Sequence, residues 1–185
     1  LMSLNARGLR NTFKRKSVLA WIKNQKADII FLQETHSTEN CEALWKKEWK
    51  GKIFFSHGTE FSKGVITLIK DDLDCQVNTV ECDKDGRYVI LNTLVQETPL
   101  ILTNIYAPDK EKDQENFYKT VSSLLFQAST NSEGSNVIVG GVLNICMSQL
   151  DCDRHDVKIK KSVKFVNDMT LEHDLVDIWR LRNPN

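Results

Sequence analysis

The run Ile29-Ile30-Phe31-Leu32 constrains the fold more than any other stretch of this sequence. Four consecutive apolar side chains are typical of a strand that is buried on both faces. Residues 100–105 and 135–144 have the same character, and the second of these runs enters a tight glycine turn and ends on Asn144. A sheet that contains such strands needs a covering layer on each side.

Further strands are predicted where short apolar or alternating runs are bounded by turn residues. Residues 76–81 and 87–95 alternate well, and Asp85-Gly86 between them is typical of a hairpin turn. The remaining predicted strands are residues 1–4, 53–56 and 65–69.

Amphipathic helices are predicted before, between and after these strands, over residues 13–25, 43–49, 109–127 and 160–173. Asn11 or Thr12 can cap the first helix. The apolar stripe of that helix is expected to contain Phe13, Val18, Trp21 and Ile22. Its water-facing side is expected to contain Lys14, Arg15, Lys16 and Lys23.

Hairpin-linked strands with helices at both ends of the chain favour two packed sheets that are covered by helices on the outside. The 185 residues are enough to bury a substantial core. The sequence has no internal repeat and no low-complexity linker, so we expect a single domain over residues 1–185. The chain begins at Leu1 and enters a strand almost at once, which indicates a piece of a longer protein.

The overall charge gives no sign of a nucleic-acid or membrane partner, because 25 Lys and Arg residues balance 25 Asp and Glu residues. A nucleic-acid substrate would need a local basic patch. One candidate patch contains Arg7, Arg10, Lys14, Arg15 and Lys16. A second contains Lys158, Lys160, Lys161 and Lys164.

The five cysteines are widely spaced and form no C-x-x-C pair, so neither a zinc site nor a disulfide framework is indicated. Reduced thiols and an intracellular location are expected. No apolar run approaches the length of about 20 residues that a bilayer span needs, and we expect no membrane partner.

Polar side chains recur where predicted strands end, at Asn5, Glu34, Tyr106 and Asn144. The ends of adjacent strands can converge on one face of a sheet, so these four residues form a candidate pocket. Glu34 is a hard oxygen ligand of the kind that Mg²⁺ takes. The two amides can orient a phosphate without adding negative charge, and the Tyr106 hydroxyl can donate to a phosphoryl oxygen.

Four motifs in order resemble the endonuclease/exonuclease/phosphatase superfamily, and more narrowly the endonuclease domain of LINE-type non-LTR retrotransposons. They are Leu4-Asn5-Ala6-Arg7-Gly8-Leu9, Leu32-Gln33-Glu34-Thr35-His36, Asn104-Ile105-Tyr106-Ala107-Pro108 and Gly140-Gly141-Val142-Leu143-Asn144. Shorter pieces around Asp85-Gly86-Arg87-Tyr88 and residues 175–180 lie where such domains have similar ones.

The resemblance implies an α+β fold, a four-layer α/β/β/α sandwich, and Mg²⁺-dependent phosphodiester hydrolysis that nicks DNA to prime reverse transcription. By the same resemblance Glu34 and Asn5 hold the metal, Asn5 and Asp109 contact phosphate, and Tyr106, Asn144 and Asp177 are catalytic. Asp109 stands where many relatives have Asn, which weakens that contact. Arg7, Arg10 and Lys14 would contact DNA.

Two departures from the family pattern lead us to expect that this copy is inactive. Val142 stands where relatives carry the Asp that orients or deprotonates the attacking water. Positioned acid–base groups contribute about 10²–10⁴-fold to rate, so its loss should be severe. The final Asp-His motif of relatives is absent from residues 1–185, and we expect the sandwich to be C-terminally truncated and to lack its last strands.

Three readings follow for the function. The first is a LINE-type endonuclease domain that has lost its activity, a monomer once linked to a reverse transcriptase and nuclear if it acts on chromosomal DNA. The second is a non-catalytic remnant that binds nucleic acid or protein. The third is a cellular relative that acts on abasic DNA, lipid or nucleotide phosphates.

Overall fold

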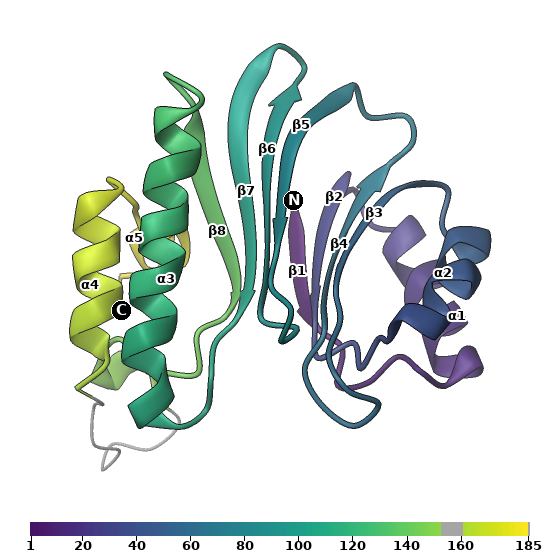
Figure 1. Ribbon diagram of the computed structural model, residues 1–185, viewed down its shortest axis with the longest axis horizontal. Coiled ribbons are helices and arrows are strands. Elements are labelled where there is room, and N and C mark those ends of the chain that lie inside the picture. The colour runs from purple at the N-terminus through teal and green to yellow at the C-terminus, as the bar shows by residue number, and fades with distance from the viewer. Residues whose placement is uncertain (153–160, 185) are drawn as a thin grey trace. The chain divides into compact units, whose positions relative to one another are not determined.

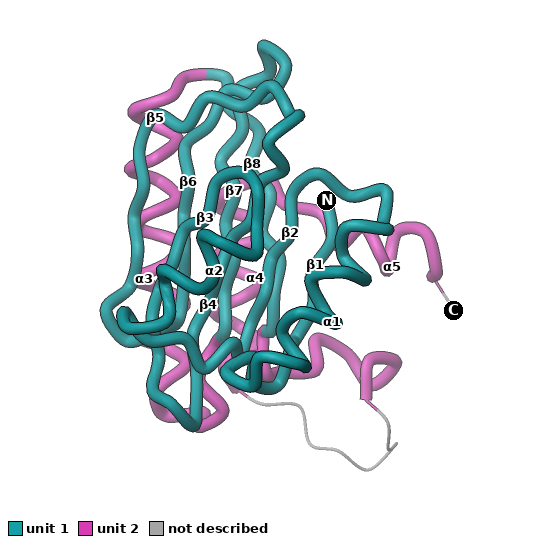
Figure 2. The backbone as a smooth tube through the Cα atoms, turned by 90° about the vertical axis from the view of Figure 1, so that its right-hand side faces the viewer, with its two compact units in different colours: residues 1–106, 134–142 teal, residues 107–133, 143–185 magenta. Residues whose placement is uncertain are grey.

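The computed structural model describes residues 1–152 and 161–184 (Figure 1). The chain divides into two compact units (Figure 2). The first unit contains residues 1–106 and 134–142, and the second contains residues 107–133 and 143–185. Lys158 and Lys160 of the second candidate basic patch lie outside the described part of the chain.

The first unit contains two four-stranded sheets and two helices. One sheet has the order β1-β2-β4-β3, formed by Met2–Asn5, Ile29–Gln33, Val65–Lys70 and Gly51–Ser56. The other has the order β5-β6-β7-β8, formed by Cys75–Cys82, Tyr88–Val95, Thr98–Tyr106 and Asn136–Val142. The β1–β2 and β7–β8 pairs are parallel and the other pairs are antiparallel.

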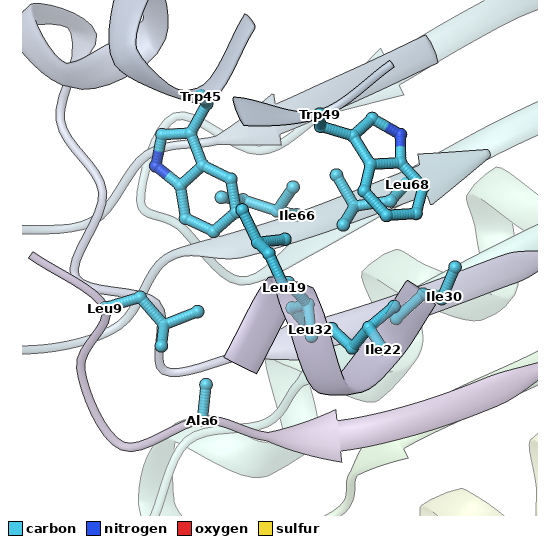
Figure 3. Packing of buried hydrophobic residues seen from close by; sticks show 10 residues of the cluster. All are labelled: Ala6, Leu9, Leu19, Ile22, Ile30, Leu32, Trp45, Trp49, Ile66 and Leu68. Atoms are coloured by element: carbon cyan, nitrogen blue, oxygen red, sulfur yellow. The ribbon is translucent and has the colours of Figure 1, made fainter. Parts of the chain in front are cut away.

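Alternation along β2 explains how these sheets are covered. Ile30 and Leu32 pack with α1 (Thr12–Lys23) and α2 (Glu42–Glu48) in one apolar cluster (Figure 3). Ile29 and Phe31 point the opposite way, into a second cluster with residues of β5, β6 and β7. Side chains of a strand alternate between faces, so one continuous apolar run serves two interfaces. The predicted double burial of this strand is therefore confirmed.

The second unit contains α3 (Glu111–Thr130), α4 (Val163–Glu172) and α5 (Ile178–Arg182). Ser122 on α3 donates to Glu172 Oε2 at 2.6 Å and lies 2.8 Å from Nε2 of His173, which joins α3 to the end of α4. In the described residues, every helix is too short or too polar to cross a membrane.

The predicted α+β class with two packed sheets is confirmed. The predicted faces of the first helix are right for Val18 and Ile22, which pack in the core cluster, and for the exposed Lys14, Lys16 and Lys23, but they are wrong for three residues. Phe13 is 84% exposed and Trp21 48% exposed, whereas Arg15 is only 1% exposed. The inward stripe is formed by Arg15, Leu19 and Ile22, a spacing of four and then three residues that fits a helix. The capping prediction is confirmed for Asn11, whose side chain accepts a hydrogen bond from Lys14 N.

Arg15 can be buried because each end of its guanidinium has partners. Its Nε and Nη2 atoms donate to the two carboxylate oxygens of Glu48 at 2.7 and 3.0 Å. Its Nη1 donates to the carbonyls of Leu9 and Arg10, and the group lies 5.9 Å from the centroid of Trp45. A bidentate pair with further hydrogen bonds meets the conditions under which a buried charge is tolerated.

The strand over residues 136–142 is also less buried than the sequence predicts. Its residues are half-buried or exposed, because β8 lies at the edge of its sheet and pairs only with β7. Steric constraints nevertheless explain why positions 140 and 141 of this strand are glycine. A Cβ on Gly140 would lie 2.9 Å from the Phe31 ring, and Gly141 has φ +131°, which L side chains rarely adopt.

Replacing Arg15 with Ala, or Glu48 with Gln, should destabilise the protein by about 3 kcal/mol, because each change leaves one buried group without its partner. Urea unfolding followed by circular dichroism measures this difference. Lys16→Ala, which removes an exposed neighbouring charge, should change stability by less than about 0.5 kcal/mol.

The same pair should make stability depend on pH. The hydrogen bond from Arg15 holds the pKa of Glu48 below its ordinary value of 4.5, so the stabilisation is present above pH 4.5 and is lost as the pH falls further. The difference between the wild-type protein and Glu48→Gln should therefore shrink in acid. A difference that stays constant down to pH 3 would contradict this account.

Candidate functional site

The ends of the parallel strands β1 and β2 bring two of the predicted site residues into contact. Asn5 pairs with Gln33 in the strand register, and Glu34 follows at once. The side-chain amide of Asn5 donates to Glu34 Oε1 at 2.8 Å, and both residues are half-buried. An amide thus orients the carboxylate and occupies one of its oxygens.

The backbone around Glu34 is held on both sides by neighbouring loops. On one side Gly8 N donates to Glu34 O at 2.6 Å, and Leu9 N donates to Thr35 O at 2.9 Å. On the other side Thr35 N and His36 N donate to the carbonyls of Gly64 and Lys63 at 3.0 and 2.9 Å. The loop after β2 is therefore fixed as firmly as a central strand of a sheet.

This fixation maintains a strained backbone. Arg7, Glu34 and His36 have φ values of +47°, +50° and +54°, although none of them is glycine. Each such residue costs about 1–3 kcal/mol and persists only where the surroundings determine it. Strain of this kind concentrates at functional sites, which fits a role for Glu34 beyond ending a strand.

A buried amide pair joins the end of β2 to the opposite sheet. Gln33 Nε2 donates to Asn104 Oδ1 at 2.7 Å, and Asn104 Nδ2 donates to Ile66 O at 3.0 Å. Asn104 lies two residues before Tyr106, so the end of β7 is held beside the end of β2. Glu34 and Tyr106 are therefore carried by strand ends on the same side of the two sheets.

Tyr106 is itself fixed by Arg87. The guanidinium carbon of Arg87 lies 5.1 Å from the centroid of the Tyr106 ring, and its Nη1 donates to Tyr106 O at 3.3 Å. In return Tyr106 N donates to Arg87 O at 2.7 Å. Tyr106 is 9% exposed, so its ring is buried and is held in place at this strand end.

Val142 pairs with Tyr106 in the β7–β8 register and faces the opposite sheet. Ile138 and Val142 pack against the cluster between the sheets, and Gly140 between them meets Phe31. A side chain at position 142 therefore points toward the same space as Tyr106. Valine fills this position with apolar surface and can neither accept a proton nor bind a cation.

The other three predicted site residues belong to the second unit. Asn144, with φ +54°, donates through Nδ2 to Ala107 O and to Asp109 Oδ1, both at 2.7 Å. Gln114 Nε2 donates to Asn144 O at 3.2 Å. Asp177 is exposed and caps α5 by accepting a hydrogen bond from Arg180 N at 2.9 Å. The predicted catalytic roles of Asn144 and Asp177 stay predictions, as does the phosphate contact of Asp109.

The three predicted DNA contacts are exposed, and two of them already have partners. Lys14 Nζ donates to the carbonyls of Ala6 and Arg7 at 2.8 and 2.7 Å, which holds the loop after Asn5. Arg10 Nη1 lies 2.7 Å from Glu60 Oε2 in an ion pair. Arg7 is exposed at the turn, where its backbone N donates to Asn5 Oδ1.

Sequence reasoning missed Gln33, Asn104 and Arg87, which position the predicted site residues. A signal was present for two of them, because Gln33 and Asn104 are amides within strongly apolar strand segments. A buried polar residue needs a buried partner. The sequence does not say which amide pairs with which, since 71 residues separate the two.

The residues present are suited to a hard cation. Among residues 1–152 and 161–184, no Lys, Arg or His forms an ion pair with Glu34, so its charge is not neutralised by the protein. In the same residues no three His, Cys, Asp or Glu side chains gather as a metal cage. One carboxylate with a neighbouring amide is a ligand set that Mg²⁺ accepts and that zinc does not.

Comparison with known proteins agrees with this arrangement. Residues 2–157 match the model of the endonuclease/exonuclease/phosphatase family. Over all 185 residues the chain is 33% identical to the transposon TX1 uncharacterized 149 kDa protein of Xenopus laevis, and it spans 14% of that protein's length.

Two solved structures share the fold at low sequence identity. An AP endonuclease from Leishmania major has a TM-score of 0.74 and 18% identity, covering 99% of this chain and 68% of its own. An AP endonuclease from Archaeoglobus fulgidus has a TM-score of 0.70 and 18% identity, covering 100% of this chain and 74% of its own. The match of residues 2–157, on a sandwich of two sheets with Asn5 and Glu34 at their ends, shows that the chain belongs to the endonuclease/exonuclease/phosphatase family.

Proposed function

We propose that this chain is the nuclease part of a retroelement protein, and that it keeps a DNA-phosphate and divalent-metal site but has lost efficient cutting. The observation that carries the proposal is the hydrogen bond of 2.8 Å between Asn5 and Glu34 at the ends of β1 and β2. It is supported by the family match and by the likeness to a transposon protein.

In this proposal Glu34 holds Mg²⁺ and Asn5 orients the carboxylate that does so. The ion, when bound, would supply positive charge against a phosphate oxygen and the charge that develops there. Tyr106 would donate from its phenol to a phosphoryl oxygen, since its ring is already held by Arg87. By the family resemblance, phosphate contacts by Asn144 and Asp109 and a supporting role for Asp177 belong to the same proposal.

The missing function is removal of a proton from the attacking water. The register places position 142 beside Tyr106 and facing the opposite sheet, where a carboxylate would reach the space at the strand ends. Val142 leaves that space without a base. DNA binding without efficient cutting follows, which also agrees with a remnant that serves as a binding module. A link to a reverse transcriptase, a monomeric state and a nuclear location stay predictions.

Metal binding tests the role of Glu34 independently of cutting. Adding Mg²⁺ or Mn²⁺ should raise the melting temperature of the wild-type protein, because a ligand that binds only the folded state stabilises it. Glu34→Gln should abolish this rise while leaving the melting temperature without metal nearly unchanged. Isothermal titration calorimetry with Mn²⁺ gives the affinity directly.

The control for this measurement is Glu39→Gln, which removes an exposed carboxylate a few residues further along the same segment. It should keep the full metal response. If Glu34→Gln and Glu39→Gln respond to metal as the wild-type protein does, Glu34 is not the metal ligand.

Restoring a carboxylate tests the loss of cutting. Val142→Asp, made in the full reading frame that encodes this chain, should increase the nicking rate on supercoiled plasmid with Mg²⁺ by about 10²-fold or more. The control is Val142→Asn, because asparagine has nearly the same shape as aspartate but accepts no proton. It should give no such increase. A folded Asp variant that nicks no faster than the Asn variant would overturn the assignment of position 142.

A further inference from the structure

We propose that Phe61 stacks against a base of double-stranded DNA beside the phosphate held at the Glu34 site. This inference rests on the proposed function and adds a contact to it. Phe61 lies on the loop over residues 57–64, between β3 and β4, and its side chain is 84% exposed. The other residues of this loop are polar or glycine, so the exposed ring is available to a partner that binds beside it.

The loop presents Phe61 in a fixed position. Thr59 Oγ1 accepts hydrogen bonds from Phe61 N and Ser62 N at 3.2 and 3.0 Å, and Thr59 N donates to Ser62 O at 2.9 Å. These bonds close a tight turn directly around the phenylalanine. A side chain on such a turn loses little freedom when it binds, so its contact contributes more to affinity.

The base of the loop is attached to the segment that carries Glu34. Gly64 O and Lys63 O accept from Thr35 N and His36 N, and Gly58 N donates to Ser37 O at 3.1 Å. Gly64 has φ +89°, and a Cβ there would lie 2.6 Å from Thr35 Oγ1, so only glycine permits this approach. A partner that binds at Glu34 therefore meets the loop in a constant geometry.

The charge around the loop indicates that this partner is a polyanion. Residues 7–16 contain four exposed basic residues, Arg7, Arg10, Lys14 and Lys16, and no acidic residue, while the fifth, Arg15, is buried against Glu48. This strip is joined to the loop by the ion pair of 2.7 Å between Arg10 and Glu60. Aromatic side chains among cations are the pattern with which proteins stack on bases while they contact phosphates. An apolar wedge beside backbone contacts can also unstack a base step of a duplex.

The test measures binding of a short fluorescein-labelled DNA duplex by anisotropy without divalent metal, so that neither cutting nor metal binding enters. Phe61→Ala should bind about 5- to 100-fold more weakly, the loss expected for one stacked base. Phe61→Tyr should bind within about twofold of the wild-type protein because it keeps the ring. Phe126→Ala removes a phenylalanine that is 61% exposed on α3 and should leave binding unchanged.

A second readout reports stacking itself. In duplexes with 2-aminopurine at successive positions, the wild-type protein should change the fluorescence at one position. The Phe61→Ala variant, at a concentration that saturates the DNA, should leave the fluorescence at that position unchanged. Equal DNA binding by Phe61→Ala and the wild-type protein would overturn the inference while leaving the proposed function intact.

Four other outcomes also decide the matter. Equal losses in the Phe61 and Phe126 variants, or a loss that tyrosine does not restore, would overturn the stacking contact. Weaker binding of Phe61→Ala to phosphatidylserine vesicles with unchanged DNA affinity would assign the ring to a membrane surface instead. No DNA binding by the wild-type protein would overturn the proposed function, and this inference with it.

Discussion

The hydrogen bond between Gln33 and Asn104 sets the relation between the two sheets on which the site depends. Sheets packed only by apolar contacts can slide with little penalty, whereas a buried amide without its partner costs about 1–3 kcal/mol. This pair, at 2.7 Å, therefore selects one alignment. It also explains why Glu34 and Tyr106, each one or two residues beyond these amides, keep a defined relation across the interface.

Hydrogen bonds to neighbouring segments also explain why the backbone is strained just after β2. Glu34 and His36 have left-handed backbones, and both lie in the short segment that hydrogen-bonds to loops on its two sides. The sheets supply rigidity, the amide pair supplies alignment, and the surrounding loops hold the carboxylate in a conformation that an isolated strand end would abandon. Glycine at position 64 is the condition for this arrangement, since any side chain there would strike Thr35.

A structural feature of this protein could be predicted from the sequence where residues close by in the chain determine it. The strands, the hairpin at Asp85-Gly86 and the strand-end residues Asn5 and Glu34 follow from apolar runs and turn residues that neighbouring positions reveal. The burial of Arg15 does not, because its partner Glu48 is 33 residues away and a charged residue normally faces water. The strand β8 is less buried than its apolar sequence predicts, because it lies at the edge of its sheet. Apolar content predicts burial of a strand only if other strands lie on both sides of it.

Val142 adds apolar packing at the position where the proposed function expects a catalytic carboxylate in other members of the family. A carboxylate at position 142 would have to be partly desolvated beside the cluster between the sheets, which is unfavourable without a compensating partner. Valine has a strong preference for strands and adds apolar contact to the same cluster. Valine at this position therefore favours packing over a buried charge, in the direction in which stability usually trades against activity. The Asn5–Glu34 hydrogen bond, the amide pair and the Arg87–Tyr106 contact do not involve residue 142, so they do not depend on which side chain stands there.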